Sequence, residues 1–300
     1  MSSIFDDLNE RQIEAVTHFE GPLLVIAGAG SGKTKALTNR IAYLIIEKGI
    51  NPWNILAVTF TNKAAKEMKI RVLKLLGNKE VLSANGGFYE DNTIPTVGTF
   101  HSICVRILRK YIHLLGYENE FVIYDDTDQQ ILMKHILEDM MLDPKKMVPR
   151  AILGSISNAK NQLLGPKEFA SYAHDFFSEK VAEIYPRYQK ALIKGNALDF
   201  DDIIMKTVEL FQTHPEVLEV YREKFKFISV DEYQDTNKAQ YLLVKMLAEK
   251  YRNLCVIGDA DQSIYSWRGA TIQNILDFEK DYPDARVVTL EQNYRSTQLI

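Results

Sequence analysis

The stretch AGAGSGKT at residues 27–34 follows directly on the apolar run Leu23–Ile26. That run is too short for a helix and lacks polar alternation, which favours a strand buried on both faces of a parallel sheet. Three glycines without a Cβ let successive N–H groups line an anion cradle at a helix start: Gly28, Gly30 and Gly32. Lys33 adds positive charge for the β- and γ-phosphates, and the Thr34 hydroxyl can hold Mg²⁺. Ala27 replaces the first glycine of the usual pattern, but the set predicts a phosphate-binding loop over an ordinary glycine-rich turn. It names no reaction by itself.

The composition bounds the class of protein. With 300 residues, 46% of them hydrophobic and 25% charged, the chain can bury a large core and is expected to form more than one domain. Its net charge is -4, so any contact with DNA or RNA must come from local patches. The amino-terminal segment is acidic and no run of about 18 apolar residues follows, which disfavours secretion and membrane spanning. Cys104 and Cys255 lie in apolar surroundings without metal-ligand spacing, so we expect reduced thiols in a cytoplasmic protein.

Six short apolar runs rich in β-branched residues predict strands, at residues 23–28, 55–60, 95–100, 225–232, 254–259 and 285–290. Helical patterns lie between most of them, which predicts a doubly wound parallel sheet with ligands beyond the carboxyl ends of its strands. Residues 101–224 contain no comparable run, and much of this interval has helical spacing, for example behind Asp125 and Thr127 as candidate caps. We therefore expect an α/β fold, a parallel sheet flanked by helices, with an inserted all-helical subdomain at about residues 115–199.

A second chemical site is predicted in FISVDEYQDTNKAQ at residues 227–240, where a buried strand delivers two adjacent carboxylates. Asp231 can reach the coordination shell of a magnesium ion, and Glu232 can take a proton from the water that attacks the γ-phosphate. Two adjacent acidic residues alone more often mark the solvated end of a strand than a catalytic pair. Together with a phosphate loop after another buried strand they indicate a Walker B site, and a glutamate base favours hydrolysis over phosphoryl transfer to an acceptor.

A third site is predicted in VIGDADQSIYSWRGA at residues 256–270. Gln262 can hydrogen-bond a terminal phosphate. Tyr265, Trp267 and Arg268 bring two aromatic faces and a guanidinium onto one segment, a combination suited to stacking unpaired bases and holding backbone phosphate. The alternative for Trp267 is a core residue, and its polar neighbours favour stacking.

The motifs occur in a fixed order: LNERQ (8–12), AGAGSGKT (27–34), AVTFTNKAAKEM (57–68), TVGTFHS (96–102), LDFDD (198–202), VDEYQDTN (230–237), GDADQSIYSWRGA (258–270) and LEQNYRS (290–296). This ordered set resembles the amino-terminal half of superfamily 1A DNA helicases of the UvrD/Rep/PcrA type, along essentially the whole chain. The resemblance implies a RecA-like P-loop NTPase fold, ATP and Mg²⁺ as cofactors, and ATP-dependent translocation 3′ to 5′ on single-stranded DNA.

The resemblance also assigns residues to the nucleotide. The implied ATP-binding residues are Gln12, Ala27, Gly28, Ala29, Gly30, Ser31, Gly32, Lys33, Thr34, Lys35, Arg40, Tyr294 and Arg295. Gln12 would read the adenine edge, Tyr294 would stack on the adenine, and Arg295 would act as an arginine finger. Arg40 would help to hold the nucleotide, with a surface arginine as the alternative. The implied catalytic residues are Lys33, Glu232, Gln262 and Arg295, and the metal would be held by Thr34 and Asp231.

The implied DNA-binding residues come from three motifs and are Phe60, Thr61, Asn62, Lys63, His101, Ser102, Tyr265, Trp267 and Arg268. Phe60 would line a base pocket, and its neighbours would contact the DNA backbone. Implied partners are single-stranded DNA, junctions of single- and double-stranded DNA, and repair or replication-initiator proteins. Three alternatives stay open: a general P-loop hydrolase or kinase, a strand-binding module without unwinding, and the motor part of a helicase-nuclease.

Superfamily 1A helicases carry a second RecA-like domain, whereas this sequence ends at Ile300. We therefore expect a piece of a longer protein, whose partner is the remaining carboxyl-terminal half, over a natural short form. The implied domains are a RecA-like ATP-binding domain (1-114 and 200-290), the helical insertion 1B (115-199) and the start of a second motor domain (291-300). Because ATP is hydrolysed between the two RecA-like domains in this family, we expect weak binding and little turnover from the isolated chain.

Overall fold

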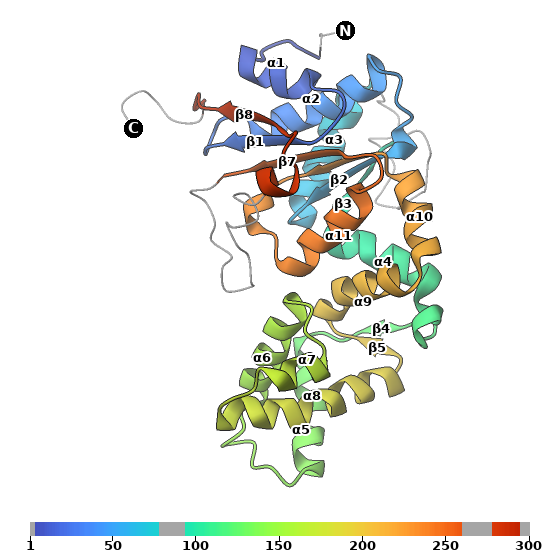
Figure 1. Cartoon of the computed structure of the whole chain (residues 1–300), viewed down its shortest axis with the longest axis vertical. Coiled ribbons are helices and arrows are strands. Elements are labelled where there is room, and N and C mark those ends of the chain that lie inside the picture. The colour runs from blue at the N-terminus through green and yellow to red at the C-terminus, as the bar shows by residue number, and fades with distance from the viewer. Residues whose placement is uncertain (1–3, 78–93, 260–277, 295–300) are drawn as a thin grey trace.

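The structure is a computed structural model that describes residues 4–77, 94–259 and 278–294. An α/β body with a central sheet lies at one end, and a smaller body of helices lies at the other (Figure 1). The sheet has six strands, all parallel, in the order β3-β2-β6-β7-β1-β8. They are β1 (Leu23–Ala27), β2 (Ile55–Thr59), β3 (Thr96–Thr99), β6 (Phe227–Val230), β7 (Asn253–Gly258) and β8 (Arg286–Leu290). The six predicted strands and the parallel α/β fold are thus confirmed.

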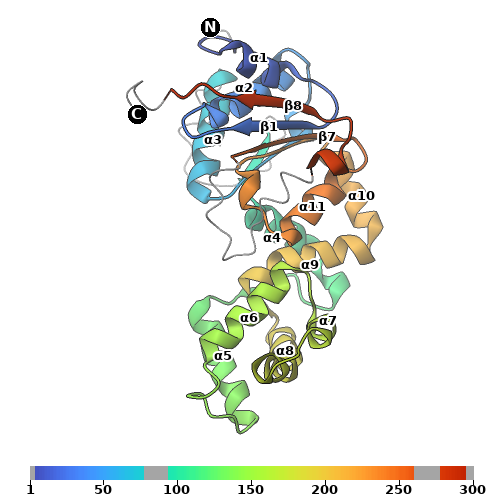
Figure 2. The same cartoon turned by 60° about the vertical axis from the view of Figure 1, so that its left-hand side comes forward.

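Both faces of the sheet are buried, because successive side chains along each strand point to opposite sides. On β1, Leu24 belongs to one hydrophobic core, while Leu23 and Val25 belong to another on the opposite face. One core is closed by α1 (Glu10–Thr17), α2 (Lys33–Ile46) and α3 (Asn62–Leu75). The other is closed by α4 (Phe100–Tyr111), α9 (Phe200–Thr213), α10 (Pro215–Lys224) and α11 (Lys238–Ala248). Figure 2 shows helices on both sides of the sheet, which explains why the strand sequences are apolar without alternation.

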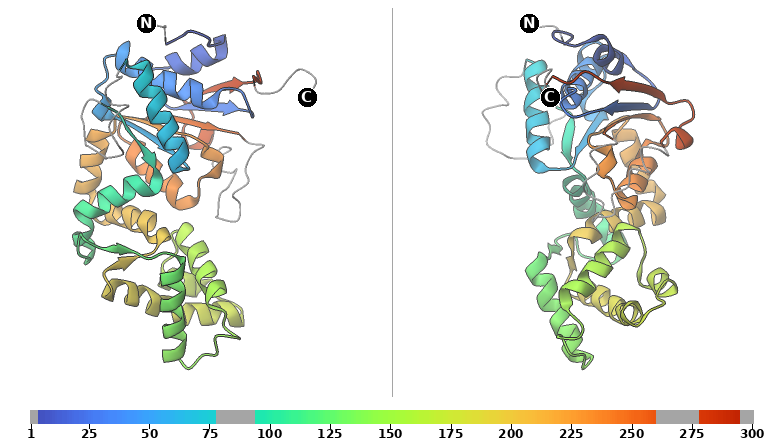
Figure 3. Two further views of the ribbon diagram at one scale, coloured as in Figure 1. Left: turned by 180° about the vertical axis from the view of Figure 1, so that it is seen from behind. Right: turned by 90° about the vertical axis from the view of Figure 1, so that its left-hand side faces the viewer.

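The insertion forms its own core around Tyr185 and Tyr188, both fully buried. It contains α5 (Asp126–Asp139), α6 (Pro149–Asn161), α7 (Pro166–Ser171) and α8 (Phe176–Lys194). Figure 3 shows it from two further directions as a helical body beyond α9. Asp125 caps α5 as expected, whereas Thr127 lies inside the first turn and only donates its N–H to that cap.

The insertion is not entirely helical, which corrects the expectation of an all-helical segment. The two-residue strands β4 (Val122–Ile123) and β5 (Ala197–Leu198) pair in parallel where the chain enters and leaves it. The N–H of Val122 donates to Asn196 O at 3.0 Å, and the N–H of Tyr124 donates to Leu198 O at 2.9 Å. Two extended segments that run side by side satisfy their backbone groups in this way, and pairs so short leave no periodicity in the sequence.

Two further expectations bear on the surroundings of the chain. Cys104 and Cys255 are both buried free thiols, as their apolar neighbours in the sequence predicted. Within the described ranges, no helix has the length and apolar character needed to cross a membrane.

Candidate nucleotide and nucleic-acid site

The predicted site residues gather along one edge of the sheet, because the carboxyl ends of parallel strands meet there. Segments assigned to the nucleotide follow β1, β6 and β8, and segments assigned to DNA follow β2 and β3. In the strand order, the strands that lead to the DNA segments lie on one side and those that lead to the nucleotide segments lie on the other. The two groups of strands are adjacent at one seam, where β2 pairs with β6. Across this seam the N–H of Asp231 donates to Val58 O at 2.9 Å.

The phosphate-loop segment has the shape that an anion cradle requires. Gly32 is the N-cap of α2 with φ +85°, and a Cβ built there would come within 2.5 Å of Gln12 Nε2. Ser31 is buried and its Oγ donates to Gly28 O at 2.8 Å, which closes the turn. Since a glycine cap offers no side-chain acceptor, the first N–H groups of α2 are left for an anion. Ala27 is the last buried residue of β1, and Thr34 lies half-buried in the first turn of the helix.

Lys33 lies between two carboxylates from neighbouring strand ends. Its Nζ is 3.5 Å from Glu232 Oε2 and 3.6 Å from Asp259 Oδ2. The Nζ atom is buried and makes no hydrogen bond within the described part of the chain. Burying an ammonium group without hydrogen-bond acceptors costs free energy. Phosphate oxygens can accept its hydrogen bonds and carry the opposite charge. The residues present therefore fit a polyphosphate next to a divalent cation.

The two acidic residues after β6 have different environments. Asp231 is buried, with 5% of its surface exposed, whereas 38% of the Glu232 side chain is exposed. Burial, followed by the charge of Glu232, raises the pKa of Asp231 to about 7, while the Glu232 N–H and the charge of Lys33 act against that rise. A bound divalent cation would oppose the same rise, because it favours the carboxylate form.

The backbone of Glu232 is left-handed, with φ 50° and ψ 46°. Its N–H donates to Asp231 Oδ1 at 3.0 Å. A non-glycine residue in this conformation costs about 1–3 kcal/mol, and such residues concentrate at functional sites. The conformation separates the two adjacent carboxylates, so that one lies in the interior and the other at the open edge.

Gln234 and Asp259 complete this cluster, and neither was predicted from the sequence as a site residue. Gln234 is 1% exposed, and its Nε2 donates to Glu232 Oε2 at 2.8 Å. Its Oε1 accepts the N–H of Asp259 at 2.9 Å, so one amide bridges the ends of β6 and β7. Asp259 could have been found by the strand-end rule that selected Asp231. No comparable signal marks Gln234.

The predicted adenine end is built from α1 and the segment after β8. Gln12 is 1% exposed; its Nε2 donates to Ser31 O at 2.9 Å, and its Oε1 accepts the N–H of Asn9 at 3.1 Å. Tyr294 is 54% exposed, its N–H donates to Gly30 O at 2.9 Å, and its hydroxyl accepts from Asn9 Nδ2 at 2.7 Å. Gln12 and Tyr294 therefore both contact the phosphate loop, while their roles toward adenine stay predictions.

Two predicted nucleotide residues instead contact the amino-terminal segment. Arg40 is 3% exposed, so the alternative of a surface arginine is wrong. Its guanidinium donates to the carbonyls of Ala15, at 3.2 Å, and of His18, where the carboxyl end of α1 attracts a cation. Lys35 donates from Nζ to Asp7 O at 2.6 Å. Ala29, in the phosphate loop, is exposed.

The predicted DNA residues after β2 lie at the amino end of α3. Phe60 is half-buried, and Asn62 and Lys63 are exposed in the first turn. Thr61 is the N-cap, and its Oγ1 accepts the N–H of Ala64 at 3.1 Å. A helix start with an exposed lysine is suited to a backbone phosphate.

After β3, the side chains of His101 and Ser102 have different contacts. The His101 ring stacks on Phe200, with centroids 3.7 Å apart and planes at 21°. Phe200 is 49% exposed and lies in the LDFDD motif, for which no role was predicted. The Ser102 hydroxyl serves the capping box of α4, where it accepts the N–H of Thr99 and donates to its carbonyl, both at 2.9 Å.

Five predicted residues lie outside the described residues, namely Gln262, Tyr265, Trp267, Arg268 and Arg295. Within the described ranges, no group of three or more His, Cys, Asp or Glu side chains has the arrangement of a metal cage. A magnesium ion held by one carboxylate, a hydroxyl and phosphate oxygens does not need one.

Comparisons with known proteins place these observations in a family. A sequence model of the UvrD/REP helicase N-terminal domain matches residues 8–283. The ATP-dependent DNA helicase PcrA of Staphylococcus aureus strain Mu50 is 55% identical over 300 residues, which is all of this chain and 40% of that protein. PcrA of Staphylococcus epidermidis strain RP62A is 54% identical over the same span. The chain therefore spans about two fifths of the length of these relatives.

Proposed function

Because the chain belongs to the UvrD/REP helicase N-terminal domain family, we propose that it is the ATP-binding half of a DNA helicase and translocase. The intact protein would move 3′ to 5′ on single-stranded DNA at the expense of ATP, with Mg²⁺ as the cofactor. Independently of the family, the site supports the ATP-binding part of this proposal through Lys33. A buried ammonium between two strand-end carboxylates, directly after a glycine-rich turn, is the observation that carries it.

The nucleotide chemistry follows from the positions of the site side chains. Bound ATP with magnesium supplies a phosphoanhydride whose charge the cation partly neutralises. Lys33 and the first N–H groups of α2 bind and orient the phosphates, and Asp231 with Thr34 would hold the metal. Glu232, at the open edge, accepts the proton of the attacking water, and Gln234 fixes its carboxylate. Gln262 and Arg295 would contact the terminal phosphate by family resemblance.

The DNA track is proposed at the ends of β2 and β3. Phe60, His101 and Phe200 provide rings for unpaired bases, and Asn62 and Lys63 suit the backbone at the start of α3. The adjacency of β2 and β6 supports coupling of ATP hydrolysis to DNA binding, since the strand that leads to Asp231 is hydrogen-bonded to the strand that leads to Phe60.

The proposed domain plan has a RecA-like domain at 1-114 and 200-290, the insertion at 115-199 and the start of a second motor domain at 291-300. The remaining partners would be the second RecA-like half, junctions of single- and double-stranded DNA, and repair or replication-initiator proteins in the cytoplasm.

The test uses the intact protein that contains this chain, with ATP hydrolysis measured with and without single-stranded DNA. Glu232→Gln should lower kcat by about 10²- to 10⁴-fold and still bind nucleotide. The control is Glu47→Gln, an exposed residue at the end of α2, which should behave as the unaltered protein. Strand binding without any loss of turnover in Glu232→Gln would favour a non-catalytic binding module. Trp267→Ala should remove stimulation by DNA and spare nucleotide binding, whereas a general P-loop hydrolase would be indifferent to it.

A further inference from the structure

The segment that follows Glu232 runs through the interior. Residues 233–237 are all buried, with exposed fractions between 0% and 7%. Connecting segments usually lie at the surface, since their backbone groups need partners. Here Thr236 Oγ1 donates to Tyr233 O at 2.7 Å, and Gln234 holds Glu232. A buried segment with internal hydrogen bonds therefore connects Glu232 to Asn237.

Asn237 contacts the insertion directly. It caps α11 by accepting the N–H of Gln240 at 2.9 Å, and its Nδ2 donates to Oδ1 of Asn161, the last residue of α6. Asn161 Nδ2 donates in turn to Asp201 Oδ1 of α9 at 3.1 Å and to Ser157 O at 2.9 Å. One insertion amide thus joins the segment after Glu232 to the helix that bears Phe200.

The residue before Asn161 fixes this point of contact. The Lys160 side chain is 0% exposed, with Nζ 2.6 Å from Asp199 Oδ2 and 2.9 Å from Asp202 Oδ1. Gln189 of α8 donates to both oxygens of Asp202 at 3.0 and 3.1 Å. These bonds hold α6 and α8 to the start of α9.

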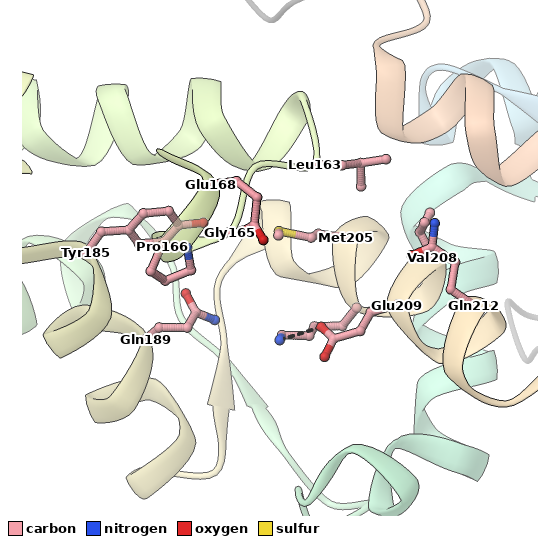
Figure 4. A pocket seen from close by; sticks show the side chains of 11 residues that line it. Leu163, Gly165, Pro166, Glu168, Tyr185, Gln189, Met205, Val208, Glu209 and Gln212 are labelled. Atoms are coloured by element: carbon pink, nitrogen blue, oxygen red, sulfur yellow. Dashed lines mark hydrogen bonds and ion pairs between the residues drawn. The ribbon is translucent and has the colours of Figure 1, made fainter. Parts of the chain in front are cut away.

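Beyond this point the packing is open. A cavity of about 330 Å³ lies between the insertion and α9, and Figure 4 shows it between Gly165, Pro166 and Glu168 on one side and Met205 and Glu209 on the other. The insertion thus meets α9 through a tight polar contact at Lys160, with a cavity beside that contact.

We propose that Asn161 and Asn237 are positioning residues that couple the nucleotide state at Glu232 to the position of the insertion. The inference rests on the proposed function. Lys33 Nζ lies 3.5 Å from Glu232 Oε2, and phosphates that draw Lys33 away would remove a partner of that carboxylate. Gln234 and the buried segment then carry the change to the Asn237–Asn161 hydrogen bond and into α6.

The test is hydrogen exchange of the intact protein that contains this chain, with and without a non-hydrolysable ATP analogue and Mg²⁺. In the unaltered chain, nucleotide should slow exchange in the phosphate loop and change exchange in α6. Asn161→Ala should abolish the α6 response, while the analogue binds within about twofold of its original Kd. Asn158→Ala, an exposed asparagine on the same helix, should retain the response.

A rescue separates coupling from mere support of the fold. Asn161→Asp together with Asp201→Asn reverses donor and acceptor between these residues and keeps an acceptor for Asn237, so the α6 response should return. An α6 response that persists in Asn161→Ala, that the reversed pair does not restore, or that is missing from a nucleotide-bound unaltered chain overturns the coupling alone. No slowing in the phosphate loop overturns the proposed function and the coupling together.

Discussion

Replacement of Lys160 by methionine tests how the insertion is held to the α/β body. Methionine keeps most of the aliphatic stem but removes the charge that lies between Asp199 and Asp202, which are 3% and 0% exposed in their side chains. In the unaltered protein these carboxylates outweigh the cost of burial and raise the pKa of Lys160. Burial, followed by the charge of Asp199, also raises the pKa of Asp202, so loss of the cation should favour the protonated form of this acid.

The magnitude follows from that protonation. Holding a proton at about pH 7 on an acid whose ordinary pKa is about 3.9 costs about 1.36 kcal/mol per pH unit, or ~4 kcal/mol in all. At about pH 5 the same reasoning gives ~1.5 kcal/mol. The assay is urea unfolding of the chain followed by far-ultraviolet circular dichroism at both pH values. A further variant that adds Asp199→Asn and Asp202→Asn keeps a cap for α9 and should recover most of the loss at neutral pH. The same loss of stability at both pH values, or a loss below about 1 kcal/mol, would refute the reasoning.

Three further predictions concern single side chains. Burial, as the largest cause, raises the pKa of Asp201 to about 6, so the folded chain keeps a proton that the unfolded chain has lost; unfolding free energy should fall by ~3 kcal/mol between about pH 4 and 6, and Asp201→Asn should remove this slope in urea titrations. Gly32→Ala should weaken ATP binding at least ~10-fold in fluorescence titrations, because its φ is +85° and its Cβ would meet Gln12; unchanged affinity would contradict the cradle. Phe200→Ala should weaken binding of a single-stranded oligonucleotide by ~1–3 kcal/mol in anisotropy measurements, whereas Phe176→Ala, on an exposed ring of the insertion, should not; equal effects would refute stacking at Phe200.

The sequence predicted the sheet well, because buried parallel strands produce continuous apolar runs. The run before the phosphate loop and the run that leads to Asp231 both form strands inside the sheet. Lys33 lies near Glu232, as expected for residues that follow the carboxyl ends of parallel strands. Residues 260–277 lie outside the described part of the chain, so the role of Trp267 stays a prediction.

Other features of the site were not predicted, and two of them depend on tertiary contacts that no local pattern encodes. Arg40 was expected at the nucleotide or on the surface, and it is buried against carbonyls of α1, 22 and 25 residues away. Ser102 was expected at DNA, but its hydroxyl pairs with Thr99 three residues before it, as short polar side chains at helix starts often do. The contact between Asn161 and Asn237 spans 76 residues and joins two common polar side chains, so nothing in the sequence marks it.

The pairing of β4 with β5 has a consequence for how this architecture can vary. Since the chain departs from the α/β body and returns to it through neighbouring backbones, the segment between them is a closed excursion. Doubling the length of a flexible excursion of this kind adds only ~0.6 kcal/mol of closure entropy, so the host fold should tolerate changes in the length of the excursion. A shortened or transplanted insertion would leave the order of the six strands intact. Any replacement must still present a cation to Asp199 and Asp202 and an amide to Asn237. These three side chains are the contact points that a replacement segment has to match.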